Sequence, residues 1–282
     1  MTAADLWMDS QDVLEKFPLV FRLNRLRLLA PKVHVLLETS AFEVKTVSDP
    51  SELKEIFKLR YNVFFREFAG RGNRFSLMPY DVDLHDFVCD HLVVKDKATN
   101  SIVATYRLMS EDQGEHKNFY TEGEFDLSGF RKLVGNKLEL GRACVHKDFR
   151  SGAVISLLWK GLCQYAKKTN TRYMFGCSSV CRAEFGSLPF IFQQLEKRDS
   201  FVKAYETKVH SQYSLASYPQ LKIPVEPALD AKNSMPSLMN MYLLAGAKMG
   251  SEMAYDEEMD CLDFFTVLDF TCLPASFERR FA

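Results

Sequence analysis

The order of expected strands and helices constrains the fold of this sequence most. Residues 42–46 alternate apolar and charged side chains as a half-buried strand does, and Asp49-Pro50-Ser51-Glu52 is a typical helix start. Two apolar runs on either side of a turn-like segment predict a hairpin, at 88–95 and 102–109. Further strands are expected at 137–146, 173–176 and 261–270, and further helices at 154–168, 185–197 and 235–247. This order predicts an α/β (α+β) fold, a mixed sheet flanked by helices.

Composition excludes several classes of protein. The chain has 282 residues, 47% hydrophobic and 26% charged, which is the composition of a globular protein. Because 36 basic residues face 37 acidic ones, no excess of positive charge suggests a nucleic-acid partner. The seven cysteines are odd in number and widely scattered, so no disulfide framework is expected. We expect a cytoplasmic protein.

The N-terminal region contains an apolar stretch, 17–37, that basic residues interrupt. We therefore expect no membrane span there, and the acidic residues before the stretch argue against a secretory signal. Within it, residues 17–30 predict a short basic amphipathic helix. Two interpretations stay open: the helix contacts anionic lipid or an acidic partner, as a peripheral membrane protein would, or it packs on its own domain.

Several strong motifs are absent from the sequence. It contains no phosphate-binding G-x-x-x-x-G-K-S/T loop, no H-E-x-x-H and no G-x-S-x-G. Cys177 and Cys181 are four residues apart, and no histidine spacing completes a zinc set. We predict no metal site.

The first expected helix carries an apolar stripe of Leu53, Ile56, Phe57, Phe64 and Phe68. Arg60 lies on this stripe, seven residues after the first of them and four before Phe64. A buried guanidinium needs a partner. We predict that Arg60 pairs with an acidic residue of the set Asp83, Asp86, Asp90 and Glu139. The alternative is a side chain that extends to solvent.

The segment Leu138-Glu139-Leu140-Gly141-Arg142 is the most unusual in the chain. In an unbroken strand Glu139 and Arg142 would point to opposite faces. A bulge near Gly141 would bring them to one face. Such a pair could be purely structural. It also suits acyl transfer to an amine, where a carboxylate accepts the proton of the attacking ammonium and a cation holds the substrate carboxylate.

A strand ends and a helix begins at Arg150, Ser151, Gly152 and Ala153. Free backbone N–H groups and the helix dipole at such a junction can hold a phosphate.

A series of motifs, in order along residues 42–270, resembles the ornithine-lipid N-acyltransferases, relatives of acyl-homoserine-lactone synthases within the GNAT superfamily. The motifs that carry the resemblance are Leu59-Arg60-Tyr61-x-Val63-Phe64, Asp83-x-x-Asp86-x-x-Cys89-Asp90-His91, Thr105-Tyr106-Arg107-Leu108, Phe119-Tyr120-x-x-x-Glu124-Phe125, Leu138-Glu139-Leu140-Gly141-Arg142-x-Cys144, Leu157-Leu158-Trp159-x-Gly161 and Tyr173-x-Phe175-Gly176-Cys177.

The resemblance implies a GNAT-like, mostly antiparallel sheet in a domain of residues 42–282, preceded by an extension of residues 1–41. It implies transfer of a (3-hydroxy)fatty acyl chain from acyl carrier protein to the α-amine of ornithine or a similar amino acid. The donor would be the acyl-phosphopantetheine of the carrier protein, with no permanently bound cofactor. Residues 150–153 depart from the usual CoA phosphate loop, which favours the carrier protein over acyl-CoA.

By the same resemblance, Glu139 and Arg142 are the expected catalytic pair. Arg60 and Phe64 would lie over the active site, while Asp83, Asp86 and Arg107 would organise the substrate pocket. Two alternatives stay open: a signal synthase that acylates S-adenosylmethionine and closes a lactone, and a catalytically silent GNAT-like module that binds membranes through residues 17–30.

Overall fold

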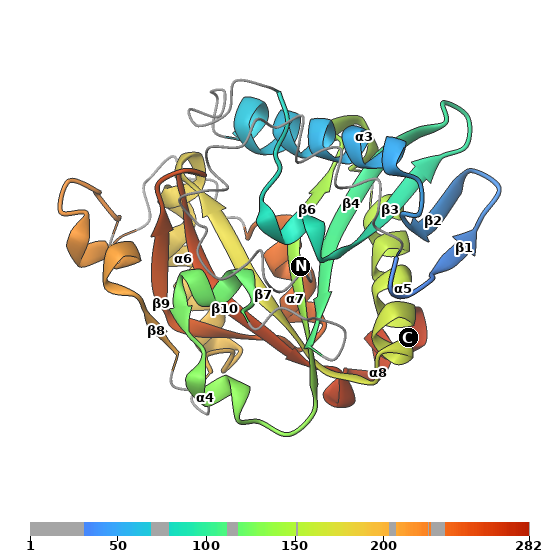
Figure 1. Ribbon diagram of the computed structural model, residues 1–282. Helices are drawn as coiled ribbons and strands as arrows, with labels where there is room; N and C mark the ends of the chain where they lie inside the picture. Colours follow the sequence, from blue (N-terminus) through green and yellow to red (C-terminus); the bar gives the residue numbers. More distant parts are fainter. Residues whose placement is uncertain are drawn as a thin grey trace, which may run out of the picture.

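An eight-stranded sheet forms the centre of the protein in the computed structural model (Figure 1), which describes residues 31–68, 79–111, 118–150, 152–202, 207–224, 226 and 235–281. The strand order is β1-β2-β3-β4-β6-β7-β10-β9, and only the β6–β7 pair is parallel. The strands are β1 (Leu36–Glu38), β2 (Phe42–Thr46), β3 (Asp90–Asp96), β4 (Ser101–Ser110), β6 (Asn136–Val145), β7 (Thr171–Cys181), β9 (Lys248–Asp256) and β10 (Cys261–Asp269). A separate two-stranded sheet pairs β5 (Phe125–Asp126) with β8 (Lys208–Val209).

Helices cover both faces of the sheet (Figure 1). They are α3 (Pro50–Tyr61), α4 (Ser128–Arg131), α5 (Ala153–Lys168), α6 (Leu188–Lys197), α7 (Ser237–Leu244) and α8 (Ala275–Phe281). Side chains alternate along β3, so Val93 packs in one cluster with α3 residues while Leu92 and Val94 pack in another with α5 residues. Helices α3 and α5 therefore lie on opposite faces.

Strands β6 and β7 diverge part-way along their length. They pair from Asn136↔Thr171 to Glu139↔Phe175, and within these two strands no pairing follows beyond that point. Gly176 lies at the point of divergence, where a Cβ atom would come within 2.2 Å of the Leu140 carbonyl oxygen. A side chain at position 176 would therefore force the strands apart.

The predicted mixed, mostly antiparallel sheet flanked by helices is confirmed, as is the hairpin, now β3 and β4. Strands β1 and β9 were not predicted, and β7 is longer than the expected 173–176. The predicted apolar stripe of the first helix was wrong at its end, because the chain continues after α3 as a π-helix, η2 (Asn62–Phe68), and Phe68 is 45% exposed.

The predicted extension of residues 1–41 is described only from residue 31. Val33 and Val35 are buried in the core, and β1 pairs with β2. The predicted basic helix 17–30 lies outside the described residues. Within the described ranges, no helix combines the length and the apolar character needed to cross a membrane.

Candidate active site

A bulge in β6 sets the geometry of the candidate site. Arg107 of β4 faces Gly141 and Thr105 faces Cys144, so β6 has one extra residue between these two pairs. Arg142 lies there with φ of 50°, a left-handed conformation that is uncommon for a residue other than glycine. The bulge shifts the alternation of side chains, so Glu139 and Arg142 share the face that α3 covers, as predicted.

Three arginines and three aspartates gather on this face in a charge-balanced cluster, which we call the Arg–Asp cluster. The arginines are Arg60, Arg107 and Arg142, and the aspartates are Asp81, Asp83 and Asp86. Asp83 is the most exposed aspartate of the cluster, with its side chain 25% exposed, and the Arg142 side chain is 13% exposed. The cluster therefore opens to solvent at this pair.

Arg60 is the buried end of the Arg–Asp cluster. Its Nε donates to Asp81 at 2.6 Å, and its two terminal nitrogens donate to Asp86 at 2.7 and 3.1 Å. The side chain is 0% exposed, so the alternative that it extends to solvent was wrong. The predicted partner set held Asp86 but omitted Asp81.

The other three predicted partners of Arg60 bind elsewhere. Asp83 accepts from Arg107 at 2.6 and 2.7 Å. Asp90 accepts from the backbone of residues 32 and 33 and from the Tyr165 hydroxyl. Glu139 accepts from the turn at residues 120–121. The prediction that Arg60 pairs with an acidic residue of this set is confirmed by Asp86, and the other three carboxylates accept from different donors.

Two carboxyls of the Arg–Asp cluster, Asp83 and Asp86, have a lowered pKa. Burial opposes charge on Asp83, but the Arg107 guanidinium holds the pKa of that carboxyl well below its usual value. His91 is buried beside Asp86, and its burial lowers its pKa to about 4, so it is neutral at pH 7. Burial also raises the pKa of the Cys144 thiol to about 12, which leaves it a poor nucleophile.

Glu139 holds a short helix against the sheet. Its carboxylate accepts from the Thr121 N–H at 2.7 Å, the Thr121 hydroxyl at 2.6 Å and the Tyr120 N–H at 2.9 Å. These donors belong to the first turn of η5 (Tyr120–Gly123). The Tyr120 ring lies beneath two guanidiniums, with Cζ of Arg107 at 5.2 Å and Cζ of Arg142 at 4.8 Å from its centroid. Tyr120 was not among the predicted site residues.

The remaining predicted residues lie at the edges of the site. Phe64 is half-buried in η2 and packs against the apolar cluster that α3 forms with Val93 of β3. Gly152 caps α5 with φ of 92° and, as a glycine, offers no side chain to the N–H groups at the start of that helix. Arg150 is paired with Glu67 and also donates to the Val145 carbonyl at 3.0 Å. Ser151 lies outside the described residues.

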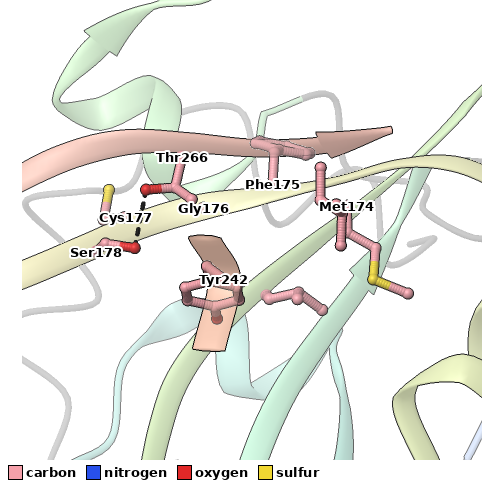
Figure 2. Close-up of a pocket in the computed structure, with 9 residues that line it drawn as sticks. Met174, Phe175, Gly176, Cys177, Ser178, Tyr242 and Thr266 are labelled. Carbon is pink, nitrogen blue, oxygen red and sulfur yellow. Dashed lines mark hydrogen bonds between the residues drawn. The ribbon is translucent and has the colours of Figure 1, made fainter. Parts of the chain in front are cut away.

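A narrow cavity follows the divergence of β6 and β7. It measures about 10 Å³, room for about one water, and Figure 2 shows the residues that line it. Cys177 and Ser178 of β7 lie on one side, and Thr266 of β10 donates to the Ser178 hydroxyl at 2.8 Å. Tyr242 of α7 closes the cavity, and its hydroxyl lies 3.0 Å from that of Tyr106. The sequence motif Phe175-Gly176-Cys177 therefore marks the start of this opening.

Comparisons with known proteins assign the family. Residues 59–160, which hold Arg60, the Arg–Asp cluster and α5 up to Lys160, match the acetyltransferase (GNAT) domain family. The chain is 32% identical over 248 residues to an L-ornithine N(alpha)-acyltransferase of Brucella abortus, covering 83% of this chain and 86% of the relative. This chain belongs to the GNAT acyltransferases, in the family that holds the L-ornithine N(alpha)-acyltransferases.

A second relative of this acyltransferase has the same name. It is the L-ornithine N(alpha)-acyltransferase of Rhizobium meliloti, 30% identical over 258 residues, which cover 85% of this chain and 83% of the relative. Among solved structures, the N-acyl amino acid synthase FeeM from uncultured soil microbes aligns with a TM-score of 0.42 at 8% identity, over 88% of this chain and 96% of that one.

Proposed function

We propose that this acyltransferase moves a (3-hydroxy)fatty acyl chain from acyl carrier protein to the α-amine of ornithine, the first step in making an ornithine lipid. The names of the curated relatives carry the choice of acceptor. The geometry supports acyl transfer in general, since the Arg–Asp cluster, with Arg142 at its solvent-facing end, lies beside the divergence of β6 and β7.

The proposed reaction is direct aminolysis of a thioester. The α-amine nitrogen attacks the thioester carbonyl, the tetrahedral intermediate expels the pantetheine sulfur, and the amine proton ends on that thiol. The divergence of β6 and β7 supports a thioester between these strands. Backbone N–H groups in the bulge at 141–144 would stabilise the oxyanion. Arg142, at the solvent-facing end of the Arg–Asp cluster, would hold the acceptor carboxylate.

Glu139 remains our candidate for the proton acceptor. Three donors already occupy its carboxylate, which offers about four lone-pair positions, so one position is left for a substrate amine. The same three hydrogen bonds give it a second role, to position Tyr120 and Thr121.

The donor is proposed to bind through its single phosphate at the start of α5. The uncapped helix start at Gly152 and Ala153 supports this, because free N–H groups and the helix dipole favour an anion. Arg150 lies beside it, and its pairing with Glu67 leaves the backbone as the main phosphate contact.

The test is an assay of the purified protein with 3-hydroxyacyl carrier protein and ornithine, read by mass spectrometry. We expect N-acylornithine and free carrier-protein thiol in equal amounts. Formation of an acyl-homoserine lactone from S-adenosylmethionine instead would favour the signal-synthase alternative. No product with any amine acceptor would contradict the proposal.

A further inference from the structure

A second, larger cavity is lined in part by Tyr120, whose ring also contacts Arg107 and Arg142 of the Arg–Asp cluster. It measures about 300 Å³, near the lower end of the range for sites that hold small molecules. Its walls are acidic and aromatic, and no lysine or arginine is among the described residues that line it. The lining residues are Tyr120, Glu124, Gln212, Tyr213, Tyr218, Asp256, Glu257 and Glu258. We call it the acidic cavity.

Glu124 is the buried carboxyl group of the acidic cavity. It is only 3% exposed, and within the described parts of the chain the one donor to its carboxylate is the thiol of Cys177, at 3.6 Å. A thiol is a weak hydrogen-bond donor. A buried carboxylate with no stronger partner is costly, so a cation that entered the cavity would gain from it.

The carboxylates around Glu124 increase this cost. Burial, together with the nearby Asp263 and Asp256, raises the pKa of Glu124 well above its usual value. Burial and Asp256 likewise raise the pKa of Asp263 to about 6. A bound cation would relieve the repulsion among these three groups.

The acidic cavity adjoins the expected place of reaction through two residues. Cys177 lines the cavity between β6 and β7 and also contacts Glu124. Tyr120 lines the acidic cavity and contacts Arg142, whose Cζ lies 4.8 Å from the ring centroid. The lining of the acidic cavity thus includes a carboxylate, Glu124, and a tyrosine ring that contacts the Arg142 guanidinium. This arrangement is complementary to an amino acid with a cationic side chain.

We propose that the acidic cavity binds the side-chain ammonium of the acceptor amino acid, with Glu124 as its main anion, and thereby selects a basic amino acid for acylation. This inference rests on the proposed function and adds to it the residues that would select the acceptor. The tyrosine rings support an organic cation, because an ammonium also binds the faces of aromatic rings.

A metal ion is the competing occupant. Ligand atoms of Glu124, Cys177 and Asp263 lie within 4.8 Å of one another. The volume of about 300 Å³ and the tyrosine walls favour an amino-acid side chain over a bare ion.

The experiment compares ornithine with norvaline, which has the same carbon chain without the side-chain amine. For the wild-type protein we expect kcat/KM to be higher for ornithine by on the order of 10²-fold. Glu124→Gln should lower kcat/KM for ornithine by a similar factor, mainly through KM, and leave norvaline little changed. Glu196→Gln, an exposed carboxylate on α6, is the matched control and should behave as wild type.

Different results would contradict this inference and the proposed function. If the wild-type protein acylates no amino acid, the proposed function fails. If it acylates ornithine and norvaline equally well, only the acidic-cavity inference fails. This comparison uses the wild-type protein alone, so it does not depend on whether a variant folds. If Glu124→Gln lowers kcat equally for both acceptors, Glu124 acts in proton transfer and the inference is overturned. Loss of activity in a chelator, restored by a divalent metal, would also overturn it.

Discussion

The carboxylate of Glu139 fixes the backbone of Tyr120, accepting its N–H at 2.9 Å. The ring held in this way contacts the guanidiniums of Arg107 and Arg142 and also lines the acidic cavity. One buried carboxylate on β6 therefore positions a tyrosine that the Arg–Asp cluster and the acidic cavity share.

Glu139→Gln is expected to lower kcat by on the order of 10²-fold, because glutamine cannot accept a proton and its amide nitrogen would face a donor. Thr121→Val removes one of the same hydrogen bonds and leaves the carboxylate. The pH dependence of kcat separates the two roles. If Glu139 accepts the proton, only Glu139→Gln should lose the fall in kcat at low pH. If Glu139 only positions Tyr120 and Thr121, both variants should keep that fall. Wild-type turnover in Glu139→Gln would contradict both roles.

Arg60→Met is expected to lower the free energy of unfolding by about 3–5 kcal/mol, since it leaves the carboxylates of Asp81 and Asp86 buried without their main cation. Urea denaturation measures the change. Arg66→Met, an exposed arginine on η2, should change it by less than about 0.5 kcal/mol. Equal stability of the two variants would show that the Arg60 pairs contribute little.

Gly176→Ala is expected to destabilise the protein by roughly 1–3 kcal/mol, because the new Cβ would lie 2.2 Å from the Leu140 carbonyl oxygen. Gly123→Ala is the matched control, since nothing lies within 4 Å of a Cβ at that position. Thermal unfolding of both variants provides the comparison. A Gly176→Ala variant as stable as the control would mean that β6 and β7 separate easily at this point.

Asp263→Asn is expected to stabilise the protein at pH 7.5 and not at pH 4. The folded-state pKa of about 6 exceeds the ordinary value of 3.8, so this group favours folding below pH 3.8 and loses that contribution as the pH rises through 6. Burial of the carboxyl raises its pKa most, repulsion from Asp256 adds to this, and the Ser179 hydroxyl and Arg142 oppose it in part. The gain should be on the order of 1–3 kcal/mol. Urea unfolding at the two pH values is the measurement, and a gain of the same size at pH 4 would contradict it.

Lys147→Glu is expected to raise KM for acyl carrier protein by about tenfold, with little change in KM for the amino acid, because an acidic carrier protein would dock near the exposed start of α5. Lys197→Glu on α6 is the matched control. The effect should shrink as salt rises past physiological strength, where the screening length is about 8 Å. Equal use of acyl-CoA and acyl carrier protein by the wild-type protein would remove support for the carrier protein as donor.

Local patterns in the sequence were sufficient for much of the fold. Period-two alternation predicted β2, turn residues predicted the β3–β4 hairpin, and an apolar helical stripe predicted α5. Strand β10 was predicted, but β9 was missed. Buried and exposed residues alternate only in part along β9, and the strand ends at an acidic residue, Asp256. Arg60 on an apolar stripe correctly indicated a buried ion pair, since burial of a guanidinium requires a partner whatever the fold.

The sequence by itself determined that Arg60 needs a partner if it is buried and that a bulge near Gly141 would bring Glu139 and Arg142 to one face, because both follow from local periodicity and residue chemistry. Only the tertiary structure decided which carboxylates pair with which arginines. It also brought Glu124, from the turn before β5, against Cys177 of β7 and close to Asp263 of β10. These contacts join residues 53 and 139 positions apart, and such distances are closed by packing of the sheet, which leaves no periodic trace along the chain.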